Sequence, residues 1–153
     1  MNIRQLTDPG NVLSVIYPHI AALRPLKGEP VLWHLRLVRY YVPAYLVCGE
    51  SGTLTEAYRA FCEDRTGLPP RRRDAPSNWK RAALDWGWRV RAQRAAEEIG
   101  KRYVEQAGGG DLQTVVQTLL GRDIFLELRL HIRTDKRRRV IRLGTVNLGP
   151  RKG

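Results

Sequence analysis

The segment that most constrains the fold is SNWKRAALDWGWRVRAQRA, residues 77–95, which holds three of the four tryptophans of the chain. Tryptophan is an anchor or core residue, whereas arginine at this density requires solvent or phosphate. Four apolar residues recur at i, i+3, i+4 and i+7 and share one helical face: Trp79, Ala82, Ala83 and Trp86. The other face presents Asn78, Lys80, Arg81 and Asp85. The spacing therefore predicts an amphipathic helix, anchored by tryptophan and basic on its open side.

Proline and glycine divide the rest of the N-terminal part into helical segments. Residues 11–24 predict one or two short helical turns, broken by Pro18. Three-to-four spacing from Val31 predicts a helix that runs to near Gly49 and is kinked or interrupted at Pro43. After the turn GESGT, a second helix ends near Gly67, with Thr53 or Thr55 as its cap.

The connection GLPPRRRDAP is predicted to be an exposed loop, since its three prolines exclude regular hydrogen bonding. Ser77 is the expected N-cap of the third helix, and Gly87 its end. A fourth helix follows from Trp88, and its expected inward residues are Val90, Ala92, Ala96, Ile99 and Tyr103.

The C-terminal part predicts a different kind of structure. GGGD, residues 108–111, is a hinge, and LQTVVQTLL is a short helix. Strict alternation in FLELRLHIRT, Phe125–Thr134, predicts a strand that pairs with VIRLGTVNL through the turn DKRRR. Because two strands alone are marginal, this hairpin requires a cover, for which a second subunit is the expectation.

The predicted fold is mainly α with a small C-terminal β-hairpin. We expect two parts: residues 1–107 as a helix-turn-helix-like domain for which the charge pattern described next predicts DNA binding, and 108–153 as a helix plus basic hairpin for oligomerisation or DNA contact.

Charge restricts the function classes. The chain has 27 Lys and Arg against 15 Asp and Glu, a formal net charge of +12. Such a field attracts polyanions, nucleic acid first and anionic membranes second. No apolar run is long enough for a span and no leader is evident, so we expect a cytoplasmic protein without membrane association. Cys48 and Cys62 have no zinc-ligand spacing and are expected to be reduced, and we expect neither metal nor cofactor.

Three helices with a basic third one indicate a helix-turn-helix-like unit bound to double-stranded DNA, with the third helix in the major groove. Near its N-terminus, Asn78, Lys80 and Arg81 are the candidates for base contacts. The candidates for phosphate contacts are Arg71, Arg72, Arg73, Arg89 and Arg91. The hairpin turn adds Lys136, Arg137, Arg138 and Arg139, which would face DNA or an acidic partner. The simpler interpretation is a solvated basic face.

Catalysis is not expected. His19, His34 and His131 lie on separate predicted elements, and His34 is interpreted as a packed or surface histidine. Glu63-Asp64 and Glu97-Glu98 are adjacent acids, which point in different directions on a helix and usually only solvate it. No nucleophile elbow, HExxH or phosphate-binding loop occurs.

Over residues 28–98 the chain resembles the N-terminal region of phage DNA-packaging proteins of the small terminase subunit type. The resemblance rests on GEPVLWHLRLVRYYV, TLTEAYRAFCEDRTG and SNWKRAALDWGWRVRAQRAAEEI. It implies a non-enzymatic DNA-recognition subunit of a phage or other mobile element. Such subunits are often ring-shaped homo-oligomers that hand DNA to a large ATPase–nuclease subunit, the large terminase. Two alternatives stay open: a structural RNA-binding protein, and a dimeric operator-binding transcriptional regulator.

Overall fold

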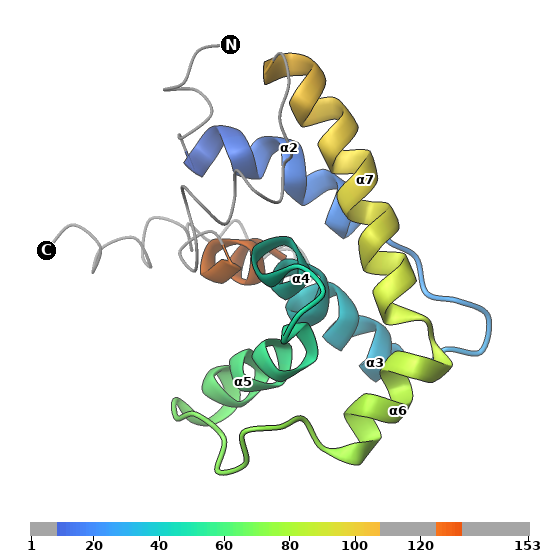
Figure 1. Cartoon of the computed structure of the whole chain (residues 1–153), viewed down its shortest axis with the longest axis vertical. Helices are drawn as coiled ribbons and strands as arrows, with labels where there is room; N and C mark the ends of the chain where they lie inside the picture. The colour runs from blue at the N-terminus through green and yellow to red at the C-terminus, as the bar shows by residue number, and fades with distance from the viewer. Residues whose placement is uncertain (1–8, 108–124, 133–153) are drawn as a thin grey trace, which may run out of the picture.

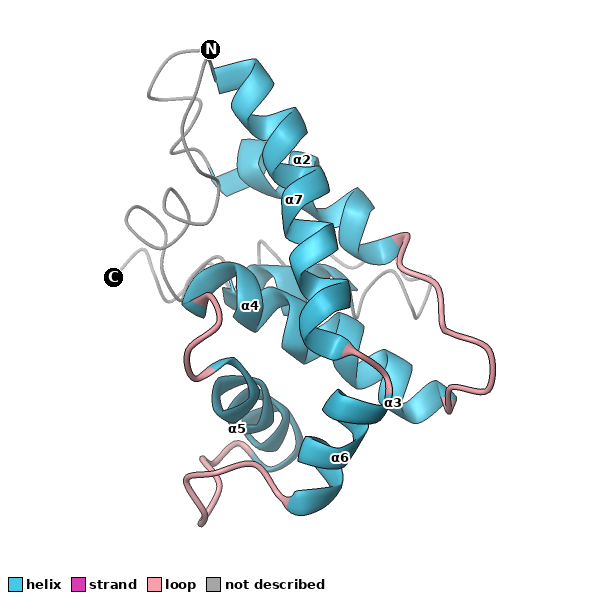
Figure 2. Cartoon of the chain, turned by 45° about the vertical axis from the view of Figure 1, so that its right-hand side comes forward, coloured by secondary structure: helices cyan, strands magenta, loops and turns pink. Residues whose placement is uncertain are grey.

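A computed structural model describes residues 9–107 and 125–132, with side chains over 13–102 and 125–132. These residues form only helices, turns and loops, and no strand occurs among them (Figure 2). The prediction of a mainly α fold is confirmed for this part of the chain. The hinge at 108–111, the short helix after it and the return strand lie outside the described residues.

The first helix, α2 (Pro9–Ala21), is longer than the one or two turns expected from the sequence. Pro18 lies inside it, where an interior proline costs about 3 kcal/mol. Leu13, Ile16 and Ile20 are 6%, 0% and 0% exposed on one face, and α2 packs on the last long helix. Burial of three such side chains contributes roughly 5–9 kcal/mol, more than enough to offset the proline.

The second helical segment is continuous from Val31 to Cys48 but changes its geometry midway. It consists of α3 (Val31–Arg36), the π-helical turn η1 (Leu37–Tyr41) and α4 (Val42–Cys48). The N–H of Val42 donates to the Leu37 carbonyl, five residues back, immediately before Pro43. Proline lacks a donor and crowds the carbonyl four residues earlier, and a wide turn relieves this crowding. The predicted kink therefore takes the form of a π-turn.

Helix α5 (Thr53–Thr66) ends at Gly67 as predicted, with Gly67 in the left-handed region at φ 77°. The expected caps are different, however. Thr53 is the first helical residue and its hydroxyl donates to the Gly49 carbonyl, while Gly52 occupies the N-cap position. The N–H of Gly49 donates to the Tyr45 carbonyl at the end of α4, and the carbonyl of the same residue accepts the Thr53 hydroxyl at the start of α5.

Helix α6 (Ser77–Asp85) and helix α7 (Trp88–Ala107) meet at Gly87, which has a φ of 59°. Ser77 was predicted as the N-cap, but Pro76 takes that position, and no side-chain cap bond forms. Along α7, Ala92 and Ile99 are fully buried as predicted, whereas Val90 is 52% exposed. Trp88, two residues before, is fully buried, so the inward face of α7 begins there and turns Val90 outward.

The prediction of a strand at Phe125–Thr134 is wrong, because residues 125–132 are helical. The same segment also carries a helical stripe, since Phe125, Leu128 and Ile132 stand at i, i+3 and i+7 and are 3%, 0% and 2% exposed. Its apolar face belongs to the core of this same chain. Over these residues the cover that the sequence analysis assigned to a second subunit comes from the N-terminal helices.

Helix α7 runs along one side of the molecule, at the right in Figure 1. Helix α2 packs along it, and α6 joins its start, while α4 contacts both α5 and α7. The loop between α5 and α6 runs along the outer edge. This arrangement exposes that loop and one face of α6 together, as the next section describes.

Candidate nucleic-acid interface

The tryptophan of α6 fixes the orientation of that helix. Trp79 is 2% exposed, and its ring centroid lies 5.9, 5.3, 5.1 and 6.0 Å from those of Trp33, Tyr58, Phe61 and Trp88. These separations suit edge-to-face aromatic pairing. Helix α6 is therefore anchored by its inner face, as predicted from the spacing of Trp79 and Ala82.

The outer face of α6 points to solvent. Asn78, Lys80 and Arg81 are all exposed. Arg81 makes an ion pair with Asp85 at 3.8 Å, but the two side chains are 82% and 56% exposed. Such a pair contributes little and gives way readily to a stronger anion. The Asn78 Oδ1 accepts a hydrogen bond from the backbone N–H of Trp79 at 3.0 Å.

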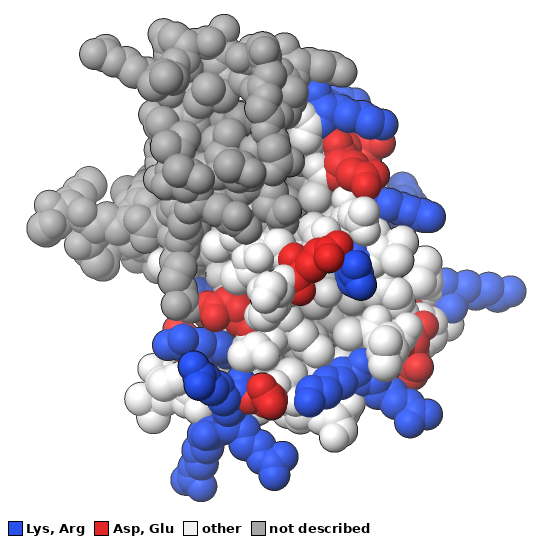
Figure 3. All heavy atoms as spheres, in the orientation of Figure 1, with Lys and Arg blue, Asp and Glu red and all other residues white. Residues whose placement is uncertain are grey.

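The loop before α6 places a second set of cations beside this face. Arg71, Arg72 and Arg73 are exposed, and within the described part of the chain none of them makes an ion pair or hydrogen bond. Over residues 71–81 five cations accompany a single acid, Asp74. In Figure 3, Lys and Arg side chains project along the lower edge, where Figure 1 shows the α5–α6 loop and α6. We call Arg71–Arg73, Asn78, Lys80 and Arg81 the basic surface.

The loop is held at both of its ends. The Thr66 hydroxyl donates to the Cys62 carbonyl at 2.9 Å and accepts the N–H of Leu68 at 3.1 Å. At the far end Ala75 is only 5% exposed and joins the core. The three arginines thus project from a segment whose two ends are fixed.

Arg91 does not belong to the basic surface, although it was a candidate for a phosphate contact. Its guanidinium is 2.7 Å from the Glu29 carboxylate, and the two side chains are 12% and 0% exposed. It also donates to the carbonyls of Trp86 and Arg24, at 3.3 and 3.1 Å. Arg91 therefore ties the loop before α3 to the start of α7, and both of its terminal nitrogens already donate within the chain.

Arg89 is exposed but lies outside the basic surface. It pairs with Glu50 at 3.0 Å, and both side chains are more than half exposed, at 66% and 55%. The pair can open, but it lies on α7 rather than on α6 or its loop. Lys136, Arg137, Arg138 and Arg139 lie outside the described residues.

An arginine that the sequence pattern did not single out, Arg36, lies among the aromatic rings around Trp79. The Arg36 guanidinium carbon lies 4.6, 4.5 and 5.2 Å from the ring centroids of Trp33, Phe61 and Trp79. Burial, and then the nearby charge of Arg65, lower the pKa of Arg36. The three ring faces favour the cation that burial disfavours. The only sequence signal was the position of Arg36, three residues after Trp33 on the same helix.

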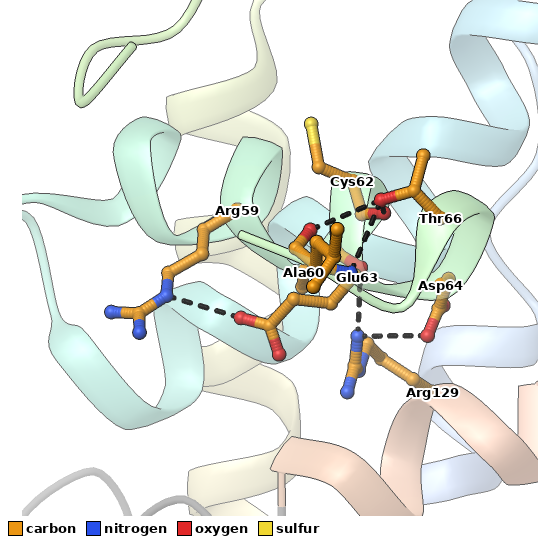
Figure 4. A network of polar contacts seen from close by, with 8 residues as sticks. Arg59, Ala60, Cys62, Glu63, Asp64, Thr66 and Arg129 are labelled. Atoms are coloured by element: carbon orange, nitrogen blue, oxygen red, sulfur yellow. Dashed lines mark hydrogen bonds and ion pairs between the residues drawn. The ribbon is translucent and has the colours of Figure 1, made fainter. Parts of the chain in front are cut away.

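Arg129 is a second arginine with an internal role. Its Nη1 donates to the Ala60 carbonyl at 3.0 Å and pairs with Asp64 at 3.2 Å. Figure 4 shows it reaching α5 from the helix at 125–132, while Arg59 pairs with Glu63 on the other side and points away. The adjacent acids Glu63 and Asp64 thus pair with two different arginines. They do not converge on one site.

Among the described residues, no group of three or more His, Cys, Asp or Glu side chains that could hold a metal ion occurs. His34 is packed, at 6% exposure, and its Nε2 lies 3.1 Å from the Leu23 carbonyl. Cys48 and Cys62 form no disulfide within the described part of the chain, and both are half-buried. In the part of the chain that the structure describes, no helix combines the length and the apolar character of a membrane span.

Comparison with known proteins adds no relative. No protein-family model, no curated protein and no solved structure matches the chain.

Proposed function

We propose that this chain is a non-enzymatic protein that binds double-stranded DNA through the basic surface. The observation that carries the proposal is the exposure of Arg71–Arg73, Lys80 and Arg81 on two adjoining elements, with Asp74 as the only acid in that stretch. Arginine forks bind phosphate in a bidentate manner, and the summed charge raises the rate of encounter with a polyanion.

In this proposal α6 acts as the recognition helix of a helix-turn-helix-like unit formed by α4, α5 and α6. Its inner face is fixed by Trp79, and its outer face offers an amide, an ammonium and a guanidinium near the helix N-terminus, where such helices contact bases. Leu84, at 83% exposure, lies on the same outer face and offers an apolar contact of the kind that thymine methyl groups accept. The loop arginines then hold phosphates beside the groove.

The biological setting that we propose is genome packaging by a phage or related mobile element. The support is the resemblance of residues 28–98 to small terminase subunits. In that setting the chain acts as a homo-oligomer and delivers DNA to a large terminase, an ATPase–nuclease subunit.

The experiment compares Lys80→Gln/Arg81→Gln with Arg94→Gln, a single exposed arginine on α7 outside the basic surface. Fluorescence anisotropy with labelled duplex DNA and with RNA of the same sequence gives both affinities. We expect the double variant to lose at least tenfold in duplex affinity, since a base-contacting side chain contributes about 1–3 kcal/mol. Arg94→Gln should lose less than twofold.

Tighter binding of the RNA than of the duplex would replace the proposal by the RNA-binding alternative. Light scattering on the same samples separates a dimeric regulator from a packaging oligomer of more copies. Equal losses in the two variants would mean that the charge acts without any localised surface.

A further inference from the structure

A pocket lies between the first half of α5 and the loop that carries the arginine run. Its volume is about 430 Å³, and its lining consists of Arg59 and Arg71–Arg73 with Thr55, Glu56, Pro69 and Pro70. The lining residues include four arginines and one glutamate, a formal balance of +3. The volume falls within the range of sites that enclose a small ligand or one unit of a polymer.

The chemistry of the lining selects phosphate. Guanidinium groups supply paired N–H donors, and the Thr55 hydroxyl can add another. None of the described residues that line the pocket is aromatic, so it lacks the stacking platform on which unpaired bases are bound. A pocket of this kind recognises charge and shape and does not distinguish one base sequence from another.

Arg59 can leave its present ion pair and bind a phosphate with only a small loss of free energy. Its ion pair with Glu63, at 3.1 Å, joins side chains that are 45% and 39% exposed. Exposed pairs of this type contribute at most about 1 kcal/mol. A phosphate in the pocket would compete with Glu63 for the guanidinium, and its two non-bridging oxygens could accept two N–H bonds where Glu63 now accepts one.

The two walls are held independently of any ligand. Arg59 and Thr55 stand on a regular helix, whereas the loop wall is fixed at Thr66 and Ala75 and stiffened by Pro69 and Pro70. Binding to a preformed site avoids part of the ordering entropy.

We infer that this is a two-walled phosphate pocket, in which Arg59 and Thr55 of α5 and Arg71–Arg73 of the loop enclose one phosphodiester group of the bound nucleic acid. The inference rests on the proposed function and adds α5 to the interface. It assigns Arg59, a residue that the charge pattern alone did not single out, as a phosphate ligand.

The test uses the full chain and three single variants, Arg59→Gln, Glu63→Gln and the control Arg94→Gln. Anisotropy titrations employ duplexes of two unrelated sequences over a range of salt concentrations. Arg59→Gln should lower affinity about tenfold on both sequences and make the log–log salt slope shallower by about one. Glu63→Gln should raise affinity by about two- to threefold, because it removes the competitor for Arg59. Arg94→Gln should change little.

A second arm separates the pocket from the proposed function, with tripolyphosphate as the probe in isothermal titration calorimetry. If duplex DNA binds with a steep salt slope but Arg59→Gln behaves like Arg94→Gln, the pocket assignment is wrong and DNA binding stands. If tripolyphosphate binds, Arg59→Gln abolishes that binding and duplex DNA does not bind, the pocket stands and the proposed function falls. Binding of neither ligand overturns both.

Discussion

Replacement of Trp79 by alanine should destabilise the protein more than any other tryptophan change in the described part. The side chain is 2% exposed and contacts four aromatic rings, those of Trp33, Tyr58, Phe61 and Trp88. Truncation of a buried tryptophan costs about 3–5 kcal/mol, and each aromatic pair contributes roughly 0.5–1.5 kcal/mol beyond its area. The two quantities overlap, so we expect a loss near the upper end, about 5 kcal/mol.

That loss is comparable to the whole stability of a small domain, about 5–15 kcal/mol. Urea unfolding followed by far-ultraviolet circular dichroism measures it directly. With a slope of about 1–3 kcal/mol per molar urea, the midpoint should fall by about 2 M or more. The matched control is Leu84→Ala on the same helix, where the side chain is 83% exposed and the change should stay within about 0.5 kcal/mol. Equal midpoints for the two variants would refute the aromatic anchor and imply that Trp79 is exposed for stacking.

Three further perturbations test other parts of the structure. Glu29→Gln should lose about 3–5 kcal/mol of unfolding free energy, because it leaves the largely buried guanidinium of Arg91 without its countercharge. Glu50→Gln, in the exposed pair with Arg89, should lose less than about 1 kcal/mol. Similar losses from the two variants would contradict the difference in burial between the two ion pairs. Removal of residues 125–153 should lower the melting temperature by far more than removal of 133–153, since only the first deletion exposes the core residues beneath the helix at 125–132. Equal melting temperatures for the two truncated chains would show that this helix does not contribute to the core. Burial lowers the pKa of His131, so the unfolded chain binds the proton more readily; stability should be complete above about pH 6.5 and decline as the pH falls from there toward the folded pKa, and His131→Gln should remove that part of the decline.

The helical segments of the N-terminal part could be predicted because their signals are local. Each of these signals lies within a few residues: the apolar stripe at Trp79 and Ala82, the glycine at the end of α5, and the proline-rich loop. The kink at Pro43 was predictable as well. Its form, a π-helical turn that keeps the helix continuous, was not predictable, because proline signals an interruption without fixing whether the helix breaks, bends or widens.

The segment at 125–132 shows why a local pattern can mislead. FLELRLHIRT carries both a period of two and an i, i+3, i+7 stripe, so the choice between strand and helix depended on its surroundings. Arg129 reaches Asp64 and the Ala60 carbonyl on α5, and His131 lies 5.7 Å, centroid to centroid, from the Tyr17 ring of α2. These contacts join residues more than sixty positions apart, which no window of sequence reveals.

For the candidate interface, the exposure of Arg71–Arg73, Lys80 and Arg81 followed from composition and helical phase. The burial of Arg91 did not follow, because its partner, Glu29, lies far away in the sequence. Arg89 and Arg91 have the same residue type on the same helix, yet Arg89 pairs with an exposed carboxylate and Arg91 with a fully buried one. Charge density in a sequence therefore identifies the region of an interface but not which of its arginines are free to bind.

The most direct test of the account is the salt dependence of duplex DNA binding by the unmodified chain. The apparent affinity is measured at several salt concentrations and plotted on logarithmic axes. Each phosphate that the chain neutralises contributes about −0.9 to the slope, so binding through several phosphate contacts should give a slope clearly steeper than about −1. A slope near zero, or no binding at low salt, would contradict the claim that this chain is a nucleic-acid-binding protein.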